Sequence, residues 1–578
     1  MPLALEKKEI VAILEEIGVL LELAGENPFK TRAYEAAART LEADPRSLED
    51  LIQSGELGKI KGIGKALEEK VVTLATTGEL DYYSALRARF PESLFDLLRI
   101  PGFGPKKVKA VYEKLDIASL DALEAAAREG KLRALDGFGA KTEQNILEGI
   151  ERVRAYQGRV LLPLAEQAAV PLFEWIRDHL DTIRSSLCGS LRRRRETIKD
   201  IDLLASSEKP DGILETFVKH PSVVKVTGHG GTKASVVLKS GMNADLRVVA
   251  DEEFPFALNY FTGSKEHNTE MRARAKERGL RLNEYAFTRE DGSRLLCKDE
   301  EEIYRTVGLE YVPPELRECT REFEWAEADK IPELLGYGDL MGTLHCHTTA
   351  SDGAADLEQM AAAAEALGYQ YLGIADHSKS AAYAGGLDEK RLARQWSEID
   401  SFNKKSKGIR LLKGSEVDIL KDGSLDFAEE VLADCDYAVA SIHSLLNLDE
   451  AAMTQRLVRA IESPGITFLG HLSGRLLLQR EPYPLNLAKV LDAAARNGKW
   501  IEINANPWRL DLDWRASMEA KERGILLVIN PDAHSTEGIS DNRYGIDVAR
   551  RAGLAQADVA NTRPLKEFLK ILSATRPH

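Results

Sequence analysis

Residues 189–202 read GSLRRRRETIKDID, and residues 243–249 read NADLRVV. Side chains at positions i and i+2 of a strand point to the same face of a sheet, so Asp200 and Asp202 share one face. Asp245 can join them from a neighbouring strand about 5 Å away. Three carboxylates on one face repel one another unless cations lie between them, and such oxygen ligands suit Mg²⁺ or Mn²⁺. An Asp-x-Asp pair alone is weak evidence, because solvent-facing acids on an edge strand are common. Two such ions could stabilise the attacking and leaving oxygens of a phosphoryl transfer, so the three aspartates are a candidate metal site.

The first 150 residues predict short helices, and one pattern occurs in them three times. The copies are LGKIKGIGKALEEKVV (57–72), LLRIPGFGPKKVKAVY (97–112) and LRALDGFGAKTEQNIL (132–147). Their glycines let the backbone approach a phosphate, and the following helix offers free N–H groups and its positive dipole end. The glycines are Gly62, Gly64, Gly102, Gly104, Gly137 and Gly139, and the lysines beyond them are Lys65, Lys106, Lys107 and Lys141. One copy fits a simple helix cap equally well. Three copies, each with a lysine, indicate sequence-independent binding to the DNA backbone.

Between residues 343 and 535, short apolar runs end in histidines and acids. The segments are TLHCHTTASDG (343–353), LGIADHS (372–378), LLKGSEVDI (411–419), AVASIHS (438–444), TFLGHLS (467–473) and LVINPDAHS (527–535). Their alternation with helical segments predicts a βα-repeat domain, and a βα barrel builds its active site at such strand ends. A lone buried histidine is more often a satisfied core residue. Six strand ends with interspersed acids instead indicate a site for Zn²⁺, Mn²⁺ or Fe.

Length, cysteine content and charge limit the class of protein. A chain of 578 residues exceeds one hydrophobic core and predicts three or more domains. The five cysteines are scattered without a Cys-x-x-Cys pair, which argues against a disulfide framework or a thiolate zinc site. The net charge of −15 does not exclude DNA, since most of the acid excess lies after residue 300. The sequence offers no signal peptide or membrane-spanning run, so we expect a cytoplasmic, nucleoid-associated protein without a membrane partner.

The stretch GSLRRRRETIKDID resembles the nucleotidyltransferase signature of family X DNA polymerases, and YFTGSKEHNTEMR (260–272) resembles their nucleotide-binding segment. The resemblance implies that Asp200, Asp202 and Asp245 are the catalytic metal triad. It implies nucleotide contacts at Gly189, Ser190, Arg193, Tyr260, Phe261, Gly263, Ser264, Asn268 and Arg272. Lys199 is a departure, because the family usually has glycine just before the first catalytic aspartate. A bulky cation there puts nucleotide affinity in question.

The C-terminal segments resemble the polymerase and histidinol phosphatase (PHP) domain. The resemblance implies a distorted seven-stranded (β/α)7 barrel that holds three divalent metals, Mn²⁺ or Zn²⁺. It implies nine ligands, namely His345, His347, Asp352, His377, Glu416, His443, His471, Asp532 and His534. In bacterial and archaeal family X polymerases this domain is associated with 3′–5′ exonuclease action and with cleavage at abasic sites.

The three glycine turns resemble the helix-hairpin-helix motif of DNA repair proteins, and the first turn contains a further candidate residue. By resemblance to the lyase domain of family X polymerases, Lys70 occupies the place of the Schiff-base lysine. A neutral amine is needed for that chemistry, and the cations Lys65 and Lys30 nearby favour it. The adjacent acids Glu68 and Glu69 oppose it. A solvated helix lysine therefore stays an alternative.

Together these resemblances predict a multidomain chain. The expected segments are a lyase-like helical domain (1–83), helix-hairpin-helix fingers (84–158), an α+β nucleotidyltransferase palm (159–251), a nucleotide-binding thumb-type subdomain (252–318), a linker (319–338) and the PHP domain (339–578). The expected function is gap-filling DNA repair by a monomer that acts on gapped or nicked DNA and deoxynucleoside triphosphates. Two alternatives remain, a phosphoesterase whose polymerase half only binds DNA, and a non-catalytic scaffold for DNA ends with structural metals. The complete ligand sets argue against both.

Overall fold

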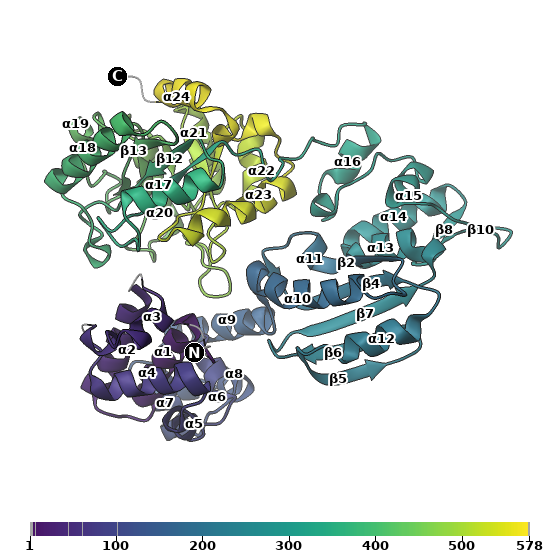
Figure 1. Ribbon diagram of the computed structural model, residues 1–578, viewed down its shortest axis with the longest axis horizontal. Coiled ribbons are helices and arrows are strands. Elements are labelled where there is room, and N and C mark those ends of the chain that lie inside the picture. Colours follow the sequence, from purple (N-terminus) through teal and green to yellow (C-terminus); the bar gives the residue numbers. More distant parts are fainter. Residues whose placement is uncertain (1–3, 6, 44–45, 61, 101, 576–578) are drawn as a thin grey trace. The chain divides into compact units, whose positions relative to one another are not determined.

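The computed structural model describes residues 4–5, 7–43, 46–60, 62–100 and 102–575 (Figure 1). The chain forms two compact units, Met1–Gln157 and Gly158–His578. Within the described residues, none of the helices combines the length and the apolar content needed to cross a membrane. The limits proposed above for the six segments inside these units stay predictions.

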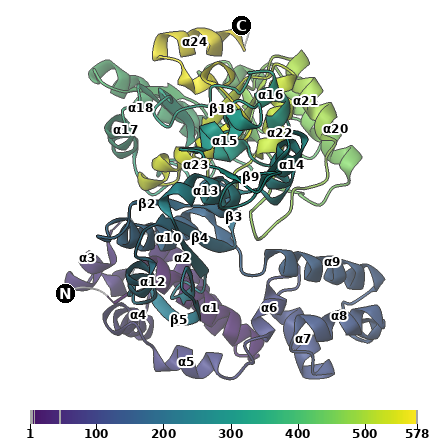
Figure 2. The same ribbon diagram turned by 90° about the vertical axis from the view of Figure 1, so that its right-hand side faces the viewer.

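The first unit consists of short helices (Figure 2). Its elements are α1 (Lys7–Leu23), α2 (Pro28–Ala43), α3 (Leu48–Gln53), η1 (Leu57–Lys59), α4 (Lys65–Thr77), α5 (Asp81–Arg87), α6 (Leu94–Leu98), α7 (Pro105–Leu115), α8 (Leu120–Arg128), η2 (Lys131–Ala134) and α9 (Ala140–Tyr156). Each repeated turn leads into one helix, because Gly64, Gly104 and Gly139 are the N-caps of α4, α7 and α9. The apolar residues just before these caps, Ile63, Phe103 and Phe138, are buried and anchor the turns in the core.

A five-stranded sheet lies at the centre of the palm region. The elements of the palm region are β1 (Val160–Leu161), α10 (Leu162–Arg177), β2 (Arg184–Leu187), α11 (Gly189–Arg192), β3 (Thr197–Ile198), β4 (Asp200–Ser206), α12 (Pro210–Val218), β5 (Val223–His229), β6 (Lys233–Leu238) and β7 (Asn243–Val249). The strand order is β2–β4–β7–β6–β5, in which only β4 and β7 run parallel. Ile201 and Leu203 of β4 pack in the same core as α10 and α12. Asp200 and Asp202 therefore point to the opposite face, which Leu204 shares with α13 (Phe254–Thr262).

The next region packs around Phe256, Phe287 and Tyr304. Its elements are η3 (Asp251–Glu253), α13, α14 (Lys265–Glu277), β8 (Leu280–Leu282), β9 (Phe287–Arg289), β10 (Arg294–Leu295), α15 (Glu300–Thr306), η4 (Pro314–Leu316) and α16 (Glu322–Glu327). The predicted nucleotide-binding segment 260–272 spans the junction between α13 and α14, so that it faces the carboxylate side of the palm sheet.

The C-terminal region is a barrel of parallel strands. The strands are β11 (Gly342–Cys346), β12 (Tyr371–Ile374), β13 (Arg410–Lys413), β14 (Glu416–Asp418), β15 (Val439–Ser441), β16 (Phe468–Leu469), β17 (Trp500–Asn504) and β18 (Leu527–Asn530). β13 and β14 follow one another across Gly414 and Ser415, so the eight strands occupy seven places. Parallel bridges from Cys346 to Ala533 and from His377 to Glu416 join the two sheets at both seams. The fold class predicted from the sequence is confirmed.

Helices and short turns follow the barrel strands (Figure 1). They are α17 (Leu357–Ala366), η5 (Ala382–Ala384), α18 (Glu389–Lys405), α19 (Glu429–Leu432), α20 (Glu450–Ile461), α21 (Leu487–Arg496), α22 (Trp514–Glu522), η6 (Glu537–Asp541), α23 (Asn542–Arg551), η7 (Gln556–Asp558), η8 (Ala560–Thr562) and α24 (Leu565–Ala574). The barrel interior is filled by large side chains such as Tyr371, Tyr437 and Phe468. Glycines in the strands make room for them.

Gly373→Ala should destabilise this barrel. A Cβ at that position would lie 2.5 Å from Tyr437 Oη and 2.6 Å from Leu344 Cδ2, both fully buried. Overpacking of this kind costs about 1–3 kcal/mol. Denaturant unfolding should reveal that loss, whereas Gly338→Ala, where the added Cβ meets no described atom within 4 Å, should unfold like the wild type. Equal stability of the two variants would contradict the packing described here.

Candidate active sites

The palm carboxylates face one another across two paired strands. In the parallel register of β4 and β7, Asp202 lies opposite Asp245, and Asp200 lies opposite Asn243. Burial, followed by the charges of Asp245 and Asp200, raises the pKa of Asp202 to about 6. Lys233 Nζ lies 2.7 Å from Asp245 Oδ2 and compensates part of the negative charge. A group of acids that disfavours its own ionisation fits a divalent cation, which would remove this repulsion.

The turn before β4 brings Gly189 against the acids. Its φ is +59°, and an added Cβ would lie 2.2 Å from Asp202 Oδ2, so no other residue fits this backbone without a shift. A cavity of about 350 Å³ opens beside this turn and Asp202. Its lining includes eight of the nine predicted nucleotide contacts, namely Gly189, Ser190, Arg193, Tyr260, Phe261, Gly263, Asn268 and Arg272. The structure therefore gathers both predicted segments around one acid.

Three side chains of this region have contacts or positions that the resemblance did not specify. The Ser264 side chain does not line the cavity but caps α14, where its hydroxyl accepts a hydrogen bond from His267 N at 3.1 Å. Arg193 lines the cavity but is 8% exposed, because its guanidinium donates to Glu318 Oε1 at 3.1 Å and to the carbonyl of Thr262. Lys199 is exposed and lies outside the cavity lining. Arg193 therefore ties the Gly189 turn to the junction of α13 and α14.

The helix-hairpin-helix turns leave their glycine backbone open. In the described part of the first unit, a Cβ added at Gly64, Gly102, Gly104, Gly137 or Gly139 would meet no atom within 4 Å. Lys65, Lys106 and Lys141 are exposed beside these turns, whereas Lys107 Nζ donates to the carbonyl of Gly102 at 2.9 Å. Open backbone next to free N–H groups at a helix start is compatible with a phosphate contact. Simple helix capping does not require such openness.

Lys70 of α4 lies close to two aromatic rings from other helices. Its Nζ is 4.8 Å from the ring centre of Tyr82 and 5.6 Å from that of Tyr34. Lys30 Nζ lies 5.5 Å from the Tyr82 ring centre, so two ammonium groups share one aromatic surface. This arrangement places the like charge near Lys70 that the sequence analysis anticipated. Its role stays a prediction.

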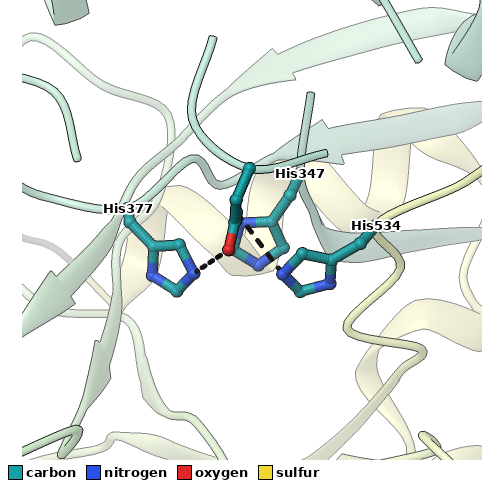
Figure 3. A group of neighbouring side chains, drawn as sticks. His347, His377 and His534 are labelled. Carbon is teal, nitrogen blue, oxygen red and sulfur yellow. Dashed lines mark ion pairs between the residues drawn. The ribbon is translucent and has the colours of Figure 1, made fainter. Parts of the chain in front are cut away.

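The barrel strands bring the nine predicted ligands into one cluster. Ligand atoms form four overlapping groups, and within each group all atoms lie within 4.8 Å of one another. The groups are His347, Asp352, His377 and His534; His345, His471 and Asp532; His345, His347 and Glu416; and His377, Glu416 and His443. Figure 3 shows the rings of His347, His377 and His534 gathered together. All three lie beside the carboxylate of Asp352, whose Oδ2 is 3.6 Å from His377 Nε2 and whose Oδ1 is 3.5 Å from His534 Nε2. His345 and Asp532 have φ values of +50° and +53°, which is backbone strain of the kind found at functional sites.

Buried atoms of this cluster lack hydrogen bonds. They are His345 Nε2, both ring nitrogens of His347, His377 Nδ1 and Glu416 Oε2, which have no hydrogen-bond partner in the described parts of the chain. They nevertheless lie close to opposite charges, since His377 Nδ1 is 2.8 Å from Glu416 Oε2 and His345 Nε2 is 3.2 Å from Glu416 Oε1. Several such atoms aimed at one another, all of types that ligate metals, fit divalent cations between them.

Charges in the cluster perturb the histidines strongly. Burial lowers the pKa of His377, but Glu416 and Asp352 outweigh burial and raise this pKa to about 10. Burial also lowers the pKa of His443, but Glu416 and Asp418 outweigh burial and raise this pKa to about 9. Despite burial, the neighbouring histidines hold the pKa of Glu416 well below its usual range. The metal-free cluster therefore holds protons where bound cations would take their place.

Sequence reasoning missed the residues that hold the ligands in place. Glu502 Oε1 lies 2.6 Å from His345 Nδ1, and Glu502 Oε2 accepts from His471 N at 2.8 Å. Asp418 Oδ1 lies 3.0 Å from His443 Nδ1. Carboxylates that fix the far nitrogen of a ligating imidazole are common in metal sites. Asp418 ends the buried strand β14, as the ligands end theirs, whereas Glu502 lies in the middle of β17, where no pattern in the sequence distinguishes it.

Two further side chains at the cluster were also missed. Arg509 Nε lies 3.4 Å from Asp532 Oδ2, and this side chain is 20% exposed. Tyr383 is 75% exposed, and the centre of its ring lies 6.5 Å from the ring centre of His377. Neither residue stood next to a ligand in the sequence, so spacing gave no signal for them.

The features described so far define a family X DNA polymerase joined to a PHP domain. They are the helix-hairpin-helix turns, the nucleotidyltransferase sheet with three acids, and the parallel barrel rich in histidines. Family models match the helix-hairpin-helix domain at residues 6–80, a SAM-like helix-hairpin-helix tandem at 94–152, the DNA polymerase beta thumb at 257–318 and the PHP domain at 343–506. The DNA polymerase/3′–5′ exonuclease PolX of Bacillus subtilis (strain 168) is 38% identical over 98% of this chain and 100% of its own length. The chain therefore belongs to the PolX family of DNA polymerases with 3′–5′ exonuclease activity.

Two other relatives match only one part of the chain each. A probable phosphatase of Thermoanaerobacter sp. (strain X514) is 28% identical over 39% of this chain and 93% of its own length. DNA polymerase lambda of Rattus norvegicus is 25% identical over 46% of this chain and 48% of its own length.

Metal binding to the cluster should release protons. At pH 7 the raised pKa values of His377 and His443 keep both protonated in the metal-free chain, and a ligating imidazole must be neutral. Mn²⁺ affinity should therefore rise as pH increases from 7 toward 9 to 10. Titration calorimetry in two buffers of different ionisation enthalpy measures the protons released. His443→Ala should reduce that number by about one, and a release independent of this histidine would contradict the protonation described.

Proposed function

We propose that this protein fills short gaps in DNA through its palm site and removes nucleotides from 3′ ends through its PHP site. The observation that carries the proposal is two separate groups of candidate metal ligands in one chain, carboxylates on β4 and β7 and imidazoles with carboxylates at the barrel strand ends. A DNA-binding platform or a structural-metal scaffold needs neither set complete. The open glycine turns support DNA as the common substrate.

In the polymerase reaction, the chain's own residues bind and orient the nucleotide. Asp200, Asp202 and Asp245 would hold Mg²⁺ or Mn²⁺, which neutralises the charge that develops on the transferred phosphoryl group. Ser190 offers a hydroxyl and Arg272 a guanidinium at the cavity that Asp202 lines. The ring centres of Tyr260 and Phe261 lie 5.2 Å apart in an edge-on arrangement. The two rings form an apolar wall suited to the sugar of the nucleotide.

In the nuclease reaction, the nine barrel residues would hold three divalent ions, Mn²⁺ or Zn²⁺. The bound metals lower the pKa of water and neutralise charge on the phosphodiester. Glu502 fixes the ring of His345, and Asp418 fixes the ring of His443, so that each imidazole presents its other nitrogen to the cluster. This chemistry is directed at 3′ ends of DNA.

The finer features of the proposal concern substrates and setting. The polymerase acts on gapped or nicked DNA with deoxynucleoside triphosphates, as a monomer in the nucleoid region of the cytoplasm. Cleavage at abasic sites stays a prediction from the resemblance, as does the lyase role of Lys70.

Substitutions at the two ligand sets should separate the two activities. Asp202→Asn should reduce primer extension by roughly 100-fold or more, because several kcal/mol of transition-state stabilisation depends on the metal ligand. It should leave 3′-end degradation unchanged. His345→Ala should have the reverse effect. Both activities are measured with Mn²⁺ on gapped DNA, and the exposed Asp211→Asn serves as control. Near-normal extension by Asp202→Asn would rule out the palm assignment.

Lys70 can be tested by covalent trapping. If this amine attacks the aldehyde of a 5′-deoxyribose phosphate, borohydride should reduce the Schiff base to a stable protein–DNA adduct. Lys70→Ala should abolish the adduct, whereas Lys65→Ala should retain it. An adduct that persists without Lys70 would assign the chemistry to another amine, and no adduct at all would leave Lys70 as a helix lysine on its aromatic surface.

A further inference from the structure

The four arginines of the stretch RRRR at 192–195 surround the nucleotide-binding turn, and acids from distant parts of the chain pair with them. Arg192 Nη2 donates to Glu300 Oε2 at 2.6 Å, and Arg193 Nε donates to Glu318 Oε1 at 3.1 Å. Arg195 Nη1 lies 3.9 Å from Glu318 Oε2. These acids belong to the region that follows the palm. One partner of Arg194, Asp547, comes from much further along the chain.

Arg194 is paired with a helix of the PHP barrel. Its Nε and Nη2 donate to the two carboxylate oxygens of Asp547 at 2.8 and 2.7 Å, which is a bidentate contact. Arg194 Nη1 donates to Glu166 Oε1 of α10 at 2.5 Å, and Tyr337 Oη donates to Asp547 Oδ1 at 2.5 Å. Only 2% of the Asp547 side chain is exposed. The pair is therefore shielded from solvent, where a charge interaction is strong.

The backbone at Arg194 shows why this pair affects the turn. Arg194 has a φ of +55°, a left-handed conformation that costs an arginine about 1–2 kcal/mol. Such a conformation persists only where surrounding contacts over-determine it. The residues on either side close back on the nucleotide-binding turn, since Arg193 N donates to Gly189 O at 3.2 Å and Arg195 N donates to Ser190 O at 3.0 Å. The position of Gly189 and Ser190 therefore depends on how Arg194 is held.

A second bridge from the same helix reaches the turn through Glu318. Arg551, the last residue of α23, donates from Nη2 to Glu318 Oε1 at 3.2 Å, and Arg193 donates to that same oxygen. Arg475 of the barrel donates from Nη2 to Glu196 Oε1 at 3.0 Å, just after the arginines. Arg475 and Arg551 are 11% and 2% exposed at their side chains. The barrel is thus connected to Arg194 and Glu196 directly, and to Arg193 through Glu318.

We propose that α23 of the PHP domain is a positioning element of the polymerase site, and that Asp547 and Arg551 are positioning residues for nucleotide binding. Neither residue lines the cavity beside Asp202, and neither belongs to the described groups of candidate metal ligands. They hold Arg194 and Glu318, and through them the turn that carries Gly189, Ser190 and Arg193. This inference rests on the proposed role of that turn in binding the triphosphate. The nucleotide affinity of the polymerase then depends on a domain whose own chemistry is different.

The test uses the full-length protein with Asp547→Asn, Arg551→Gln and the conservative Asp547→Glu. Loss of one partner from a buried pair leaves the other charge uncompensated, so the strained turn loses its support. We expect Asp547→Asn and Arg551→Gln each to raise KM for the nucleotide about 10-fold, with kcat within about twofold of the wild type. Asp547→Glu should restore part of the affinity. Single-turnover extension at varied nucleotide concentration gives the dissociation constant directly.

Two controls separate positioning from general destabilisation. Asp492→Asn removes an acid from an exposed ion pair with Arg523 elsewhere in the barrel and should leave KM unchanged. The 3′-end degradation of every variant, measured in the same preparation, reports that the barrel is folded and should equal that of the wild type.

Unchanged nucleotide affinity in both Asp547→Asn and Arg551→Gln, with nuclease activity intact, would overturn the inference. An equal loss of extension and degradation in both variants would also overturn it, because it would mark a stability effect. Failure of the proposed polymerase function is distinguishable, since it would appear as absent extension by the wild type or as normal extension by Asp202→Asn.

Discussion

The close placement of ionisable groups that the fold does not allow to separate is the constraint on which both sites depend. Asp202 and Asp245 are fixed opposite each other by the register of two strands, and neither can move away without breaking the sheet. In the barrel, carboxylates and imidazoles from six strand ends are fixed in the same way. A rigid framework keeps these ligand groups together, and the folded chain is therefore complementary to divalent cations before any arrives.

The two sites solve this constraint with different ligand chemistry. The palm uses oxygen ligands beside a cavity, and Lys233 compensates part of the charge. The barrel mixes imidazoles with carboxylates, so that protons shared among them compensate the charge of the metal-free cluster. Acids outside the ligand set, such as Glu502, keep each ring in one orientation. Ligand softness and site rigidity, not fold alone, separate the metal preferences of such sites.

Much of this organisation could be predicted from the sequence because it is local. The Asp-x-Asp spacing, the glycine turns and the strand-end histidines are patterns of a few residues, and the structure gathers them as their periodicity implies. What could not be predicted comes from contacts between distant residues. Nothing near Arg194 indicates that Asp547 pairs with it, and Glu502 looks like any acid in a buried strand. Ser264 was assigned to the nucleotide by resemblance, although the hydroxyl of a serine before a helix is also a standard cap.

The ion pairs between α23 and the arginine turn bear on how such a chain can change during evolution. The phosphoesterase chemistry would be lost by substitution of a single ligand histidine, and the barrel would still fold. Deletion of the part of the gene that encodes the barrel would leave Arg194, Glu196 and Glu318 without their partners in the barrel. A lineage that loses the barrel would therefore also need compensating substitutions around Arg192–Arg195. An inactive but retained barrel is the simpler evolutionary outcome.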